Sequence, residues 1–290
     1  MEIGFRQSHP YVIFSYYLYT GFLVMYFKHP LFLFIALILL VLVNISHDKG
    51  KALKKWTIPL VTMGLLFIIL NPFLVSQGTN ILFYFRGKQV TLEATIYGVV
   101  MALAIVGIIV MFVSFNLILN GNKFLFIFSK VLPRTTFLVM LSLRFIPLLK
   151  DRFIEINDVQ RVRGMNVSEG NIKLRTRNGM YMIQTLLTWS LEEAIQTADS
   201  MKARGYGSGK KTTYLLYKMK RQDWLSLFIL LFLFVICLVG GLLGYGKIII
   251  YPQLGTLHLY ILDWVVLVCM MLLLSFPLII EGREMLRWKY

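Results

Sequence analysis

The sequence is poor in the residues that build catalytic and metal sites. Only two cysteines and four histidines occur among its 290 residues. Cys237 and Cys269 both lie within long apolar runs, so we expect neither a disulfide framework nor a thiolate metal cluster. No two histidines have the spacing of zinc ligands, and we interpret each as a residue at the edge of a membrane span. They are His9, His29, His47 and His258.

Acidic residues are also scarce: 14 Asp and Glu stand against 30 Lys and Arg, for a net charge of +16. Among them, we place only Asp263 within an apolar run. A carboxylate inside a membrane suggests a functional site by default. Asp263 lies one turn from the end of its run, however, so we expect it to reach the lipid headgroups. With no paired carboxylates or His/Asp cluster at one depth, the sequence argues against an enzyme.

What the sequence has in excess is apolar length. Hydrophobic residues make up 58% of the chain and the mean hydropathy is +0.71, whereas soluble domains are roughly 45–50% apolar. Because a helix needs about 20 residues to cross a ~30 Å hydrocarbon core, we predict an all-α membrane protein with about six transmembrane helices. The candidate spans are 11–27, 31–45, 57–75, 94–119, 224–244 and 259–280. The sequence leaves open whether the first two, which are short, are full spans or a re-entrant pair.

The basic residues predict the orientation. Nearly all lie before the first span, between the second and third, between the fourth and fifth, or after the last. The exceptions are Lys28, Arg86, Lys88 and Lys247. Because lysine and arginine accumulate on the cytoplasmic side, we expect both termini and the long polar region to be cytoplasmic. Only one lysine or arginine, Arg6, precedes the first apolar run and no small-residue cleavage site follows that run, so we expect the span to be retained.

The predicted organisation has three parts. Residues 1–120 hold about four transmembrane helices and an external β-hairpin at 76–93, which we infer from alternating apolar residues on both sides of Arg86. Residues 121–222 form an inserted cytoplasmic region of amphipathic helices. Residues 223–290 hold the remaining transmembrane helices and a cytosolic tail.

Two helices in the polar region carry apolar stripes, with residues recurring at spacings of three and four. The first stripe comprises Phe145, Leu149, Phe153, Ile156 and Val159, and the second comprises Ile183, Leu187, Leu191, Ala194, Ala198 and Met201. We expect a polar turn at 165–179 between the helices. The stripes can either pack against each other or form an exposed docking surface.

Both of these helices end in an arginine followed by glycine, at Arg163-Gly164 and Arg204-Gly205. Glycine adopts the left-handed conformation that ends a helix, and arginine complements the negative end of the helix dipole, so ordinary capping is one interpretation. A planar guanidinium at a rigid helix tip also suits a bidentate contact with a partner's carboxylate. Two such tips in the one long polar region suggest that the chain transmits force to soluble partners.

Two other glycine patterns carry less weight. The segment GYGSGKKTT at 205–213 lacks the first glycine and the final Ser/Thr of a phosphate-binding loop and follows no strand, so we expect no nucleotide site there. Gly240 and Gly244 have the GxxxG spacing, a weak indication of close helix packing.

The sequence resembles the transmembrane T component of energy-coupling factor (ECF) vitamin transporters, the EcfT or CbiQ-like proteins. The resemblance rests on RFIPLLKDRFIEINDVQRVRG at 144–164, on SLEEAIQTADSMKARGYG at 190–207, and on the order of membrane spans around them. One departure is Val162, where the family often has a small residue before the arginine.

The resemblance implies a scaffold in a bacterial or archaeal cell membrane, not an enzyme. In the family, two ABC ATPase subunits (A and A') bind ATP and Mg, and a small membrane S component binds a vitamin or metal ion. The T component itself holds no cofactor. ATPase coupling would fall to Val162, Arg163, Gly164, Ala203, Arg204 and Gly205. The S component would dock on Phe145, Leu149, Phe153, Ile156, Ile183, Leu187, Leu191 and Ile195.

Two other functions are considered. A membrane-bound enzyme acting on lipid would use the basic cytoplasmic region to hold anionic headgroups, but it would need the catalytic cluster that we do not find. An ordinary ABC permease would also meet an ATPase, but the paired Arg-Gly ends favour the T component. The sequence does not reveal the transported substrate, because that choice belongs to the S component.

Overall fold

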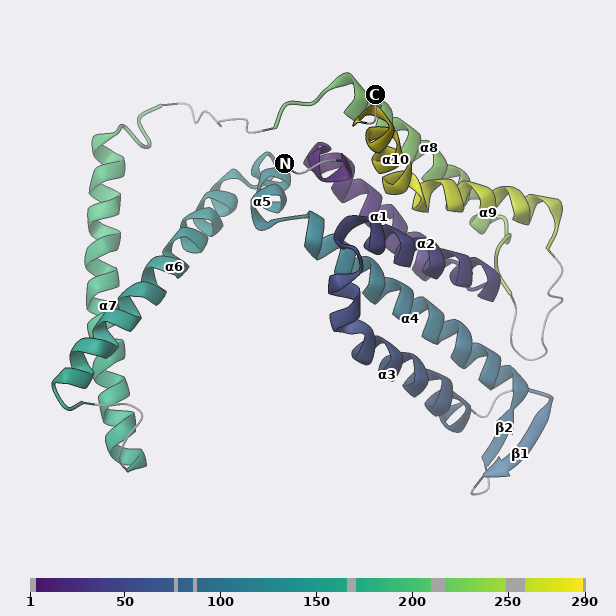
Figure 1. The fold of residues 1–290 in the computed structure, drawn as a ribbon, viewed down its shortest axis with the longest axis horizontal. Helices are drawn as coiled ribbons and strands as arrows, with labels where there is room; N and C mark the ends of the chain where they lie inside the picture. The colour runs from purple at the N-terminus through teal and green to yellow at the C-terminus, as the bar shows by residue number, and fades with distance from the viewer. Residues whose placement is uncertain are drawn as a thin grey trace. The chain divides into compact units, whose positions relative to one another are not determined.

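A computed structural model describes residues 4–75, 78–85, 88–165, 171–209, 217–248 and 259–288. The chain forms two compact units (Figure 1). The membrane unit comprises Met1–Phe124 and Tyr217–Tyr290, and the hairpin unit comprises Leu125–Leu216. Each unit is described separately below.

The membrane unit is helical apart from one β-hairpin. Its elements are a 3-10 helix at Gly4–Gln7, α1 (Pro10–Tyr26), α2 (Pro30–Asp48), α3 (Lys51–Leu74), β1 (Ile81–Phe85), β2 (Lys88–Thr91), α4 (Leu92–Ile118), α8 (Arg221–Leu242), α9 (Ile261–Leu274) and α10 (Phe276–Trp288), with α5 (Gly121–Ser129) at the boundary. Among the described residues, α2, α3, α4 and α8 are long and apolar enough to cross a membrane, and the pair α9 and α10 would be a fifth span. The prediction of an all-α membrane protein is confirmed.

The span count is approximate: beside these four or five candidates, α1 has 17 residues, which is at the lower end of the length that crosses a membrane. Helix α1 is separate from α2, with only residues 27–29 between them. The predicted spans at 31–45 and 57–75 left residues 46–56 as a linker, but most of these residues are helical. Lys49 and Gly50, with φ of 50° and 74°, alone separate α2 from α3.

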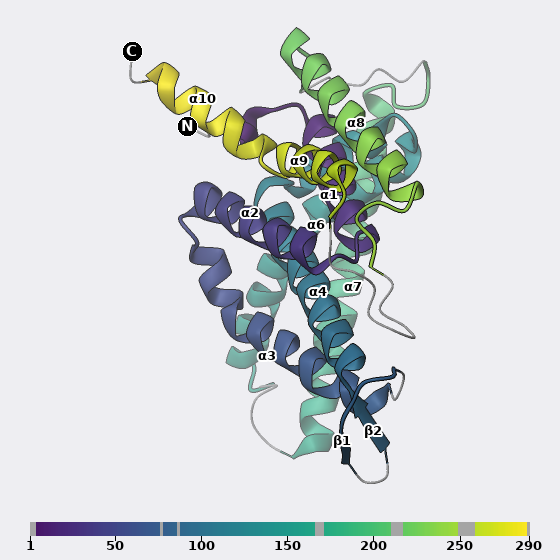
Figure 2. The same ribbon diagram turned by 90° about the vertical axis from the view of Figure 1, so that its right-hand side faces the viewer.

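Helix α4 lies at the centre of the membrane unit, packed against α1, α2 and α3, while α8 packs on α9 and α1 (Figure 1 and Figure 2). Buried polar side chains fasten these helices together. Tyr17 and Ser114 share a hydrogen bond of 2.6 Å between α1 and α4, and the Asn44 amide donates to the Val110 carbonyl at 3.0 Å between α2 and α4. An unsatisfied polar group in hydrocarbon is costly, so these bonds favour one arrangement of the helices.

The basic segments of the membrane unit meet at one end. Arg6 donates a hydrogen bond of 2.9 Å to the carbonyl of His47 at the end of α2, and Lys123 donates one of 2.8 Å to the carbonyl of Arg6. Glu281 in α10 lies 3.7 Å from His47. This grouping agrees with the distribution of lysine and arginine on which the orientation depends; the cytoplasmic placement of this end stays a prediction.

The last membrane segment, predicted as one span at 259–280, consists of two helices with a bend between them. Helices α9 and α10 meet at an angle of 50° around Ser275. Pro277 is the second residue of α10, where its missing N–H costs no helical hydrogen bond. Helix α10 then continues to Trp288, so most of the predicted tail is helical.

The expectation that Asp263 reaches the headgroups is also wrong. Its side chain is buried and accepts hydrogen bonds from the backbone N–H groups of Gly246 and Tyr260, both at 2.8 Å. Asp263 therefore caps the start of α9 and fastens the incoming loop. A carboxylate with these partners has a structural role that spacing along the sequence could not reveal.

Close helix packing depends on Gly240 and Gly241 and not on the predicted pair of Gly240 and Gly244. A Cβ at Gly240 would collide with Val266 of α9, and one at Gly241 with the Tyr26 ring of α1. Gly244 has φ of 96° and open space around it, so it ends α8 instead of packing.

Within the predicted range 76–93, Ile81–Phe85 and Lys88–Thr91 form a two-stranded antiparallel hairpin, with Phe83 opposite Val90 and Phe85 opposite Lys88. Residues 76, 77, 86 and 87 of that range lie outside the described residues. The buried carboxylate of Glu93, at the start of α4, accepts hydrogen bonds from the N–H groups of Thr79 and Asn80 at 3.3 and 3.1 Å. The hairpin is therefore tied to α4, and its external location stays a prediction.

Replacing Gly241 tests the close contact between α1 and α8. In Gly241→Ala the new methyl group overlaps the Tyr26 ring, whose position is fixed by Lys247 at 4.3 Å from the ring centre. We expect a loss of about 1–3 kcal/mol, as for other overpacked sites, seen as a lower thermal unfolding midpoint in detergent. Gly282→Ala, where the Cβ meets nothing within 4 Å, is the control. Equal midpoints for both variants would show that the contact is unimportant.

Candidate functional site: two arginine-capped helix ends

The hairpin unit consists chiefly of two long helices, α6 (Pro133–Val162) and α7 (Ile172–Ala203). The predicted polar turn at 165–179 is wrong in its second half, because α7 already begins at Ile172. Asn171 precedes that residue, and its side chain accepts a hydrogen bond from the Ile172 N–H at 2.7 Å, as an N-cap residue does. The polar composition of this stretch concealed an exposed first turn of helix.

Helix α6 ends in a pair of hydrogen bonds characteristic of a Schellman motif. The N–H of Gly164 donates to the Arg161 carbonyl at 3.0 Å, and the N–H of Met165 donates to the Gln160 carbonyl at 2.9 Å. Gly164 has φ of 77°, in the left-handed region that favours glycine. Arg163 is therefore the last residue before the backbone reverses.

Helix α7 ends in the same way. The N–H of Gly205 donates to the Lys202 carbonyl at 2.9 Å, the N–H of Tyr206 donates to the Met201 carbonyl at 3.0 Å, and Gly205 has φ of 78°. The arginines adopt closely similar backbone angles, with φ and ψ of −78° and 4° at Arg163 and −82° and 8° at Arg204. The predicted glycine caps are confirmed, and the two ends are copies of one local structure.

Both arginines are exposed, as are the residues beside them; Val162 has 90% of its surface accessible. Among the described residues neither guanidinium takes part in an ion pair, the one salt bridge of this unit joining Arg152 and Glu155 at 2.5 Å. Two positively charged groups are thus held on hydrogen-bonded helix ends, and within the described part of the chain neither pairs with a carboxylate.

The two arginine-capped ends lie at opposite ends of the hairpin unit (Figure 1). Helices α6 and α7 run antiparallel, and Phe137 near the start of α6 stacks on Tyr206 just beyond the end of α7, with ring centres 5.3 Å apart. A helix of 32 residues at ~1.5 Å per residue is about 48 Å long. The arginines are therefore too far apart to bind one small ligand, and each forms a separate contact site.

The contact between α6 and α7 uses residues that sequence reasoning missed. Met182 and Asn178 are 2% and 4% exposed, and the Arg152 guanidinium lies 4.7 Å from the centre of the Trp189 ring. The spacing of Asn178, Met182 and Trp189 by four and seven residues places them on one helix face. Because half of this face is polar, an analysis of apolar periodicity passes over it.

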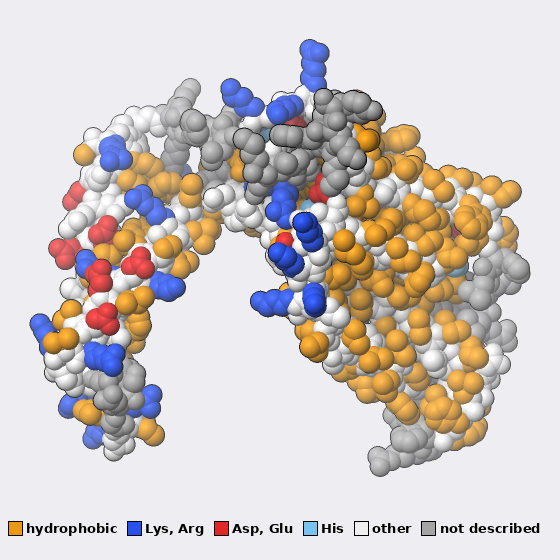
Figure 3. Space-filling view, viewed as in Figure 1, with side chains coloured by type: hydrophobic (Ala, Val, Ile, Leu, Met, Phe, Trp, Pro, Cys, Tyr) orange, Lys and Arg blue, Asp and Glu red, His pale blue; other side chains and the backbone are white. Residues whose placement is uncertain are grey.

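The predicted stripe of α7 faces away from this contact. The four residues of α7 predicted to dock the S component are more than half exposed: Ile183 by 51%, Leu187 by 63%, Leu191 by 68% and Ile195 by 57%. Of the other stripe residues, Ala194 is exposed, whereas Ala198 and Met201 are partly covered. On α6, Phe153 is exposed as well, whereas Phe145, Leu149 and Ile156 are partly covered. Of the two alternatives, the stripe of α7 therefore forms an exposed surface, mixed with charges of both signs (Figure 3).

Among the described residues no three His, Cys, Asp or Glu side chains lie close enough to hold a metal ion. The hairpin unit has two exposed helix ends and an exposed apolar stripe, and the same chain forms a bundle of membrane helices. The fold and site define a multi-pass membrane subunit whose polar helices are accessible to other proteins.

Comparison with known proteins identifies the family. The model of the CbiQ family, described as cobalt transport protein, matches residues 10–215. The chain belongs to this family, and the resemblance noted from its sequence is confirmed.

Several relatives carry the same name, energy-coupling factor transporter transmembrane protein EcfT. The Staphylococcus aureus protein is 23% identical over 218 residues, 71% of this chain and 81% of that protein. The Clostridium kluyveri protein is 27% identical over 221 residues, 72% of this chain and 81% of that protein. The Lacticaseibacillus paracasei protein is 34% identical, but over 89 residues, 30% of this chain and 34% of that protein. The chain is thus similar to ECF transporter transmembrane components over most of its length.

Replacing Gly164 tests the cap of α6. A Cβ at this position meets nothing within 4 Å, so Gly164→Ala changes only the cost of the left-handed backbone, which is about 1–2 kcal/mol for a residue other than glycine. We expect the amide hydrogens of the last turn of α6 to exchange about fivefold faster or more, measured by hydrogen-exchange mass spectrometry.

The control is Gly209→Ala, because Gly209 also has open space but its φ lies outside the left-handed region. That variant should leave exchange in α6 unchanged. If Gly164→Ala exchanges no faster than the control, the glycine does not determine the helix end.

Proposed function

We propose that this chain is the transmembrane scaffold of an ECF-type ABC importer and couples ATP hydrolysis by two ATPase subunits to reorientation of an S component. The observation that supports this most strongly is the pair of identical, exposed, arginine-capped helix ends at Arg163 and Arg204. Family membership and the names of the relatives agree with it.

The geometry of the caps suits a mechanical contact. A guanidinium offers a planar fork of donors that matches a carboxylate in bidentate fashion. Because a helix precedes each arginine and a hydrogen-bonded glycine follows it, the backbone there is already ordered, and little backbone entropy is lost when a partner closes around the arginine. Each capped end then docks in a groove of one ATPase subunit, and their separation along the hairpin gives each subunit its own contact.

The exposed stripe of α7 supplies the second surface. Ile183, Leu187, Leu191 and Ile195 present an apolar face on a polar helix, and exposed apolar patches of this kind commonly mark protein interfaces. A small hydrophobic S component is a suitable partner, with the partly covered stripe of α6 beside it. In this proposal the vitamin or metal ion is bound by the S component, and ATP and Mg are bound by the ATPase subunits.

The orientation completes the proposal. Both termini and the hairpin unit lie on the cytoplasmic side of the cell membrane in this proposal, which the distribution of lysine and arginine supports. The capped ends then face the compartment in which ATPase subunits work, and this chain acts as a non-catalytic subunit.

The role of Arg204 is tested by reversing its charge. Arg204→Glu replaces the docking cation by an anion, and loss of an interface anchor of this kind costs about 2 kcal/mol or more. We expect roughly a 30-fold loss of affinity for an ATPase subunit, measured by co-purification from membranes at graded salt. Arg144→Glu, an exposed reversal within α6, is the control. Normal co-purification and uptake in Arg204→Glu would refute the role.

The stripe is tested separately by Leu187→Asp, because Leu187 is 63% exposed and its replacement should not unfold α7. Burial of a leucine contributes about 1.5–3 kcal/mol, so we expect at least about tenfold weaker retention of the small membrane subunit, with the ATPase subunits still bound. Thr185→Asp, two residues away and exposed, is the matched control. Loss of the ATPase subunits together with the small protein would mean that the stripe is not a separate docking surface.

A further inference from the structure

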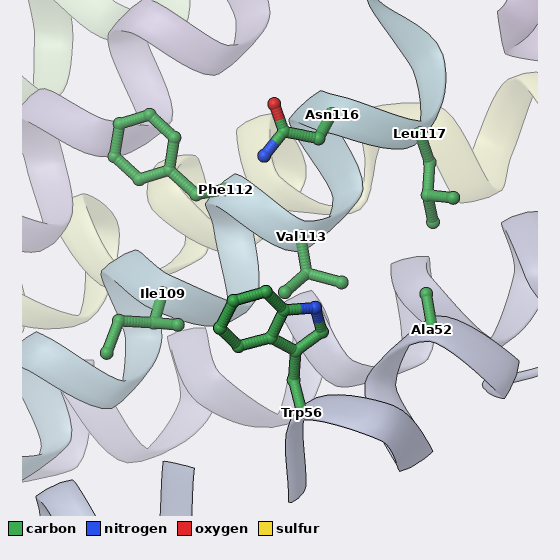
Figure 4. Close-up of a pocket in the computed structure, with 7 residues that line it drawn as sticks. All are labelled: Ala52, Trp56, Ile109, Phe112, Val113, Asn116 and Leu117. Carbon is green, nitrogen blue, oxygen red and sulfur yellow. The ribbon is translucent and has the colours of Figure 1, made fainter. Parts of the chain in front are cut away.

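A groove lies between α3 and α4 in the membrane unit (Figure 4). It has a volume of about 220 Å³ and is lined mostly by apolar side chains. Trp56 of α3 and Asn116 of α4 are the lining residues that carry polar side-chain atoms. The remaining lining residues are Ala52, Ile109, Phe112, Val113 and Leu117. Pockets that enclose a compact small molecule have about 300–1,000 Å³, so this groove suits part of an extended chain.

One end of the groove is basic. Lys51, Lys54 and Lys55 lie within the first turn and a half of α3, next to Ala52 and Trp56, and all three are exposed. None of them forms an ion pair among the described residues. Lys and Arg side chains gather at this edge of the apolar surface of the membrane unit (Figure 3). The one carboxylate at the start of α3, Asp48, already accepts a hydrogen bond from the Ala52 N–H at 3.2 Å.

The order of these features along α3 matches the profile of one leaflet. The lysines come first, Trp56 follows at 47% exposure, and the apolar residues that follow in α3 include Ile58, which is 79% exposed. Lysine and tryptophan collect at the interface between water and hydrocarbon, with aliphatic residues below them. The lysines therefore lie at headgroup depth and the groove lies at acyl-chain depth.

We propose that this groove is a binding site for an anionic phospholipid. The phosphate of the headgroup pairs chiefly with Lys55 and Lys51, which lie nearer the face of Ala52 and Trp56 than Lys54 does, and one acyl chain lies between Trp56 and the α4 side chains. Charge complementarity selects this occupant over a hydrophobic helix of a partner protein, which would leave the lysines without counter-charge. The proposal does not depend on the function proposed above.

The test uses the fluorescence of Trp56 in the full chain, purified in detergent. Phosphatidylglycerol or phosphatidylcholine with brominated acyl chains is added, and the signal of Trp56→Phe is subtracted so that only quenching of Trp56 is followed. Half-maximal quenching should need at least about tenfold less brominated phosphatidylglycerol than phosphatidylcholine, since each lysine near an anionic headgroup contributes a factor of about five. The variant K51Q/K54Q/K55Q should remove this preference.

The control variant K150Q/K173Q/K202Q removes the same charge from exposed lysines of the hairpin unit and should keep the preference. Native mass spectrometry should count at least one retained phosphatidylglycerol in the parent and control proteins and fewer in K51Q/K54Q/K55Q. Equal quenching by both lipids, or quenching unaffected by K51Q/K54Q/K55Q, would overturn the proposal and leave the groove to a partner helix or to bulk lipid. Relief of quenching by inorganic phosphate as effectively as by unbrominated phosphatidylglycerol would also overturn it.

Discussion

The membrane unit depends on one constraint: in hydrocarbon every backbone N–H and C=O must find its partner within the protein. The chain therefore crosses as helices and reverses only where they end. Its left-handed residues fall at such places, with Lys49 and Gly50 between α2 and α3, and Gly244 after α8. Glycines with positive φ also end α6 and α7 in the hairpin unit. A glycine at a helix end is therefore common in this fold and is not by itself a sign of function.

The arginines need a different explanation. At the end of α8 the N–H groups of Gly244 and Tyr245 donate to the carbonyls of Gly241 and Gly240, as in the other two caps, yet the residue before the glycine is Leu243. The dipoles of α6 and α7 already have basic partners in the last turn, at Arg161 and Lys202. Capping thus accounts for the glycines but not for the choice of arginine at positions 163 and 204, which the proposed contacts with partner proteins would explain.

The sequence predicted those features that depend on neighbouring residues. Helices, the caps at Gly164 and Gly205, and the membrane class all follow from local spacing, composition and backbone preference. Prediction from the sequence failed where the environment of a side chain depends on a residue far along the chain. Asp263 is fixed by the backbone of Gly246, and the packing at Gly241 depends on Tyr26 in another helix. The face of α7 that contacts α6 is part polar, so only the structure shows that the apolar stripe faces away from it.

The hairpin unit combines stiff ends with a loose middle. At each tip three consecutive N–H groups are bonded to helix carbonyls, and bending the tip would break bonds worth about 1 kcal/mol each. Between the helices, full burial is limited among the described residues to Gln160, Asn178 and Met182, supported by a cation–π contact worth about 0.5–2 kcal/mol. A change in the angle between α6 and α7 would therefore break fewer interactions than unwinding of either helix end, which suits the proposed role in coupling. With the stacked pair Phe137 and Tyr206 as the pivot at one end and a lever arm of roughly 20 Å, a change of about 10° moves the exposed stripe of α7 by about 3.5 Å, while the hydrogen bonds that cap each helix stay intact.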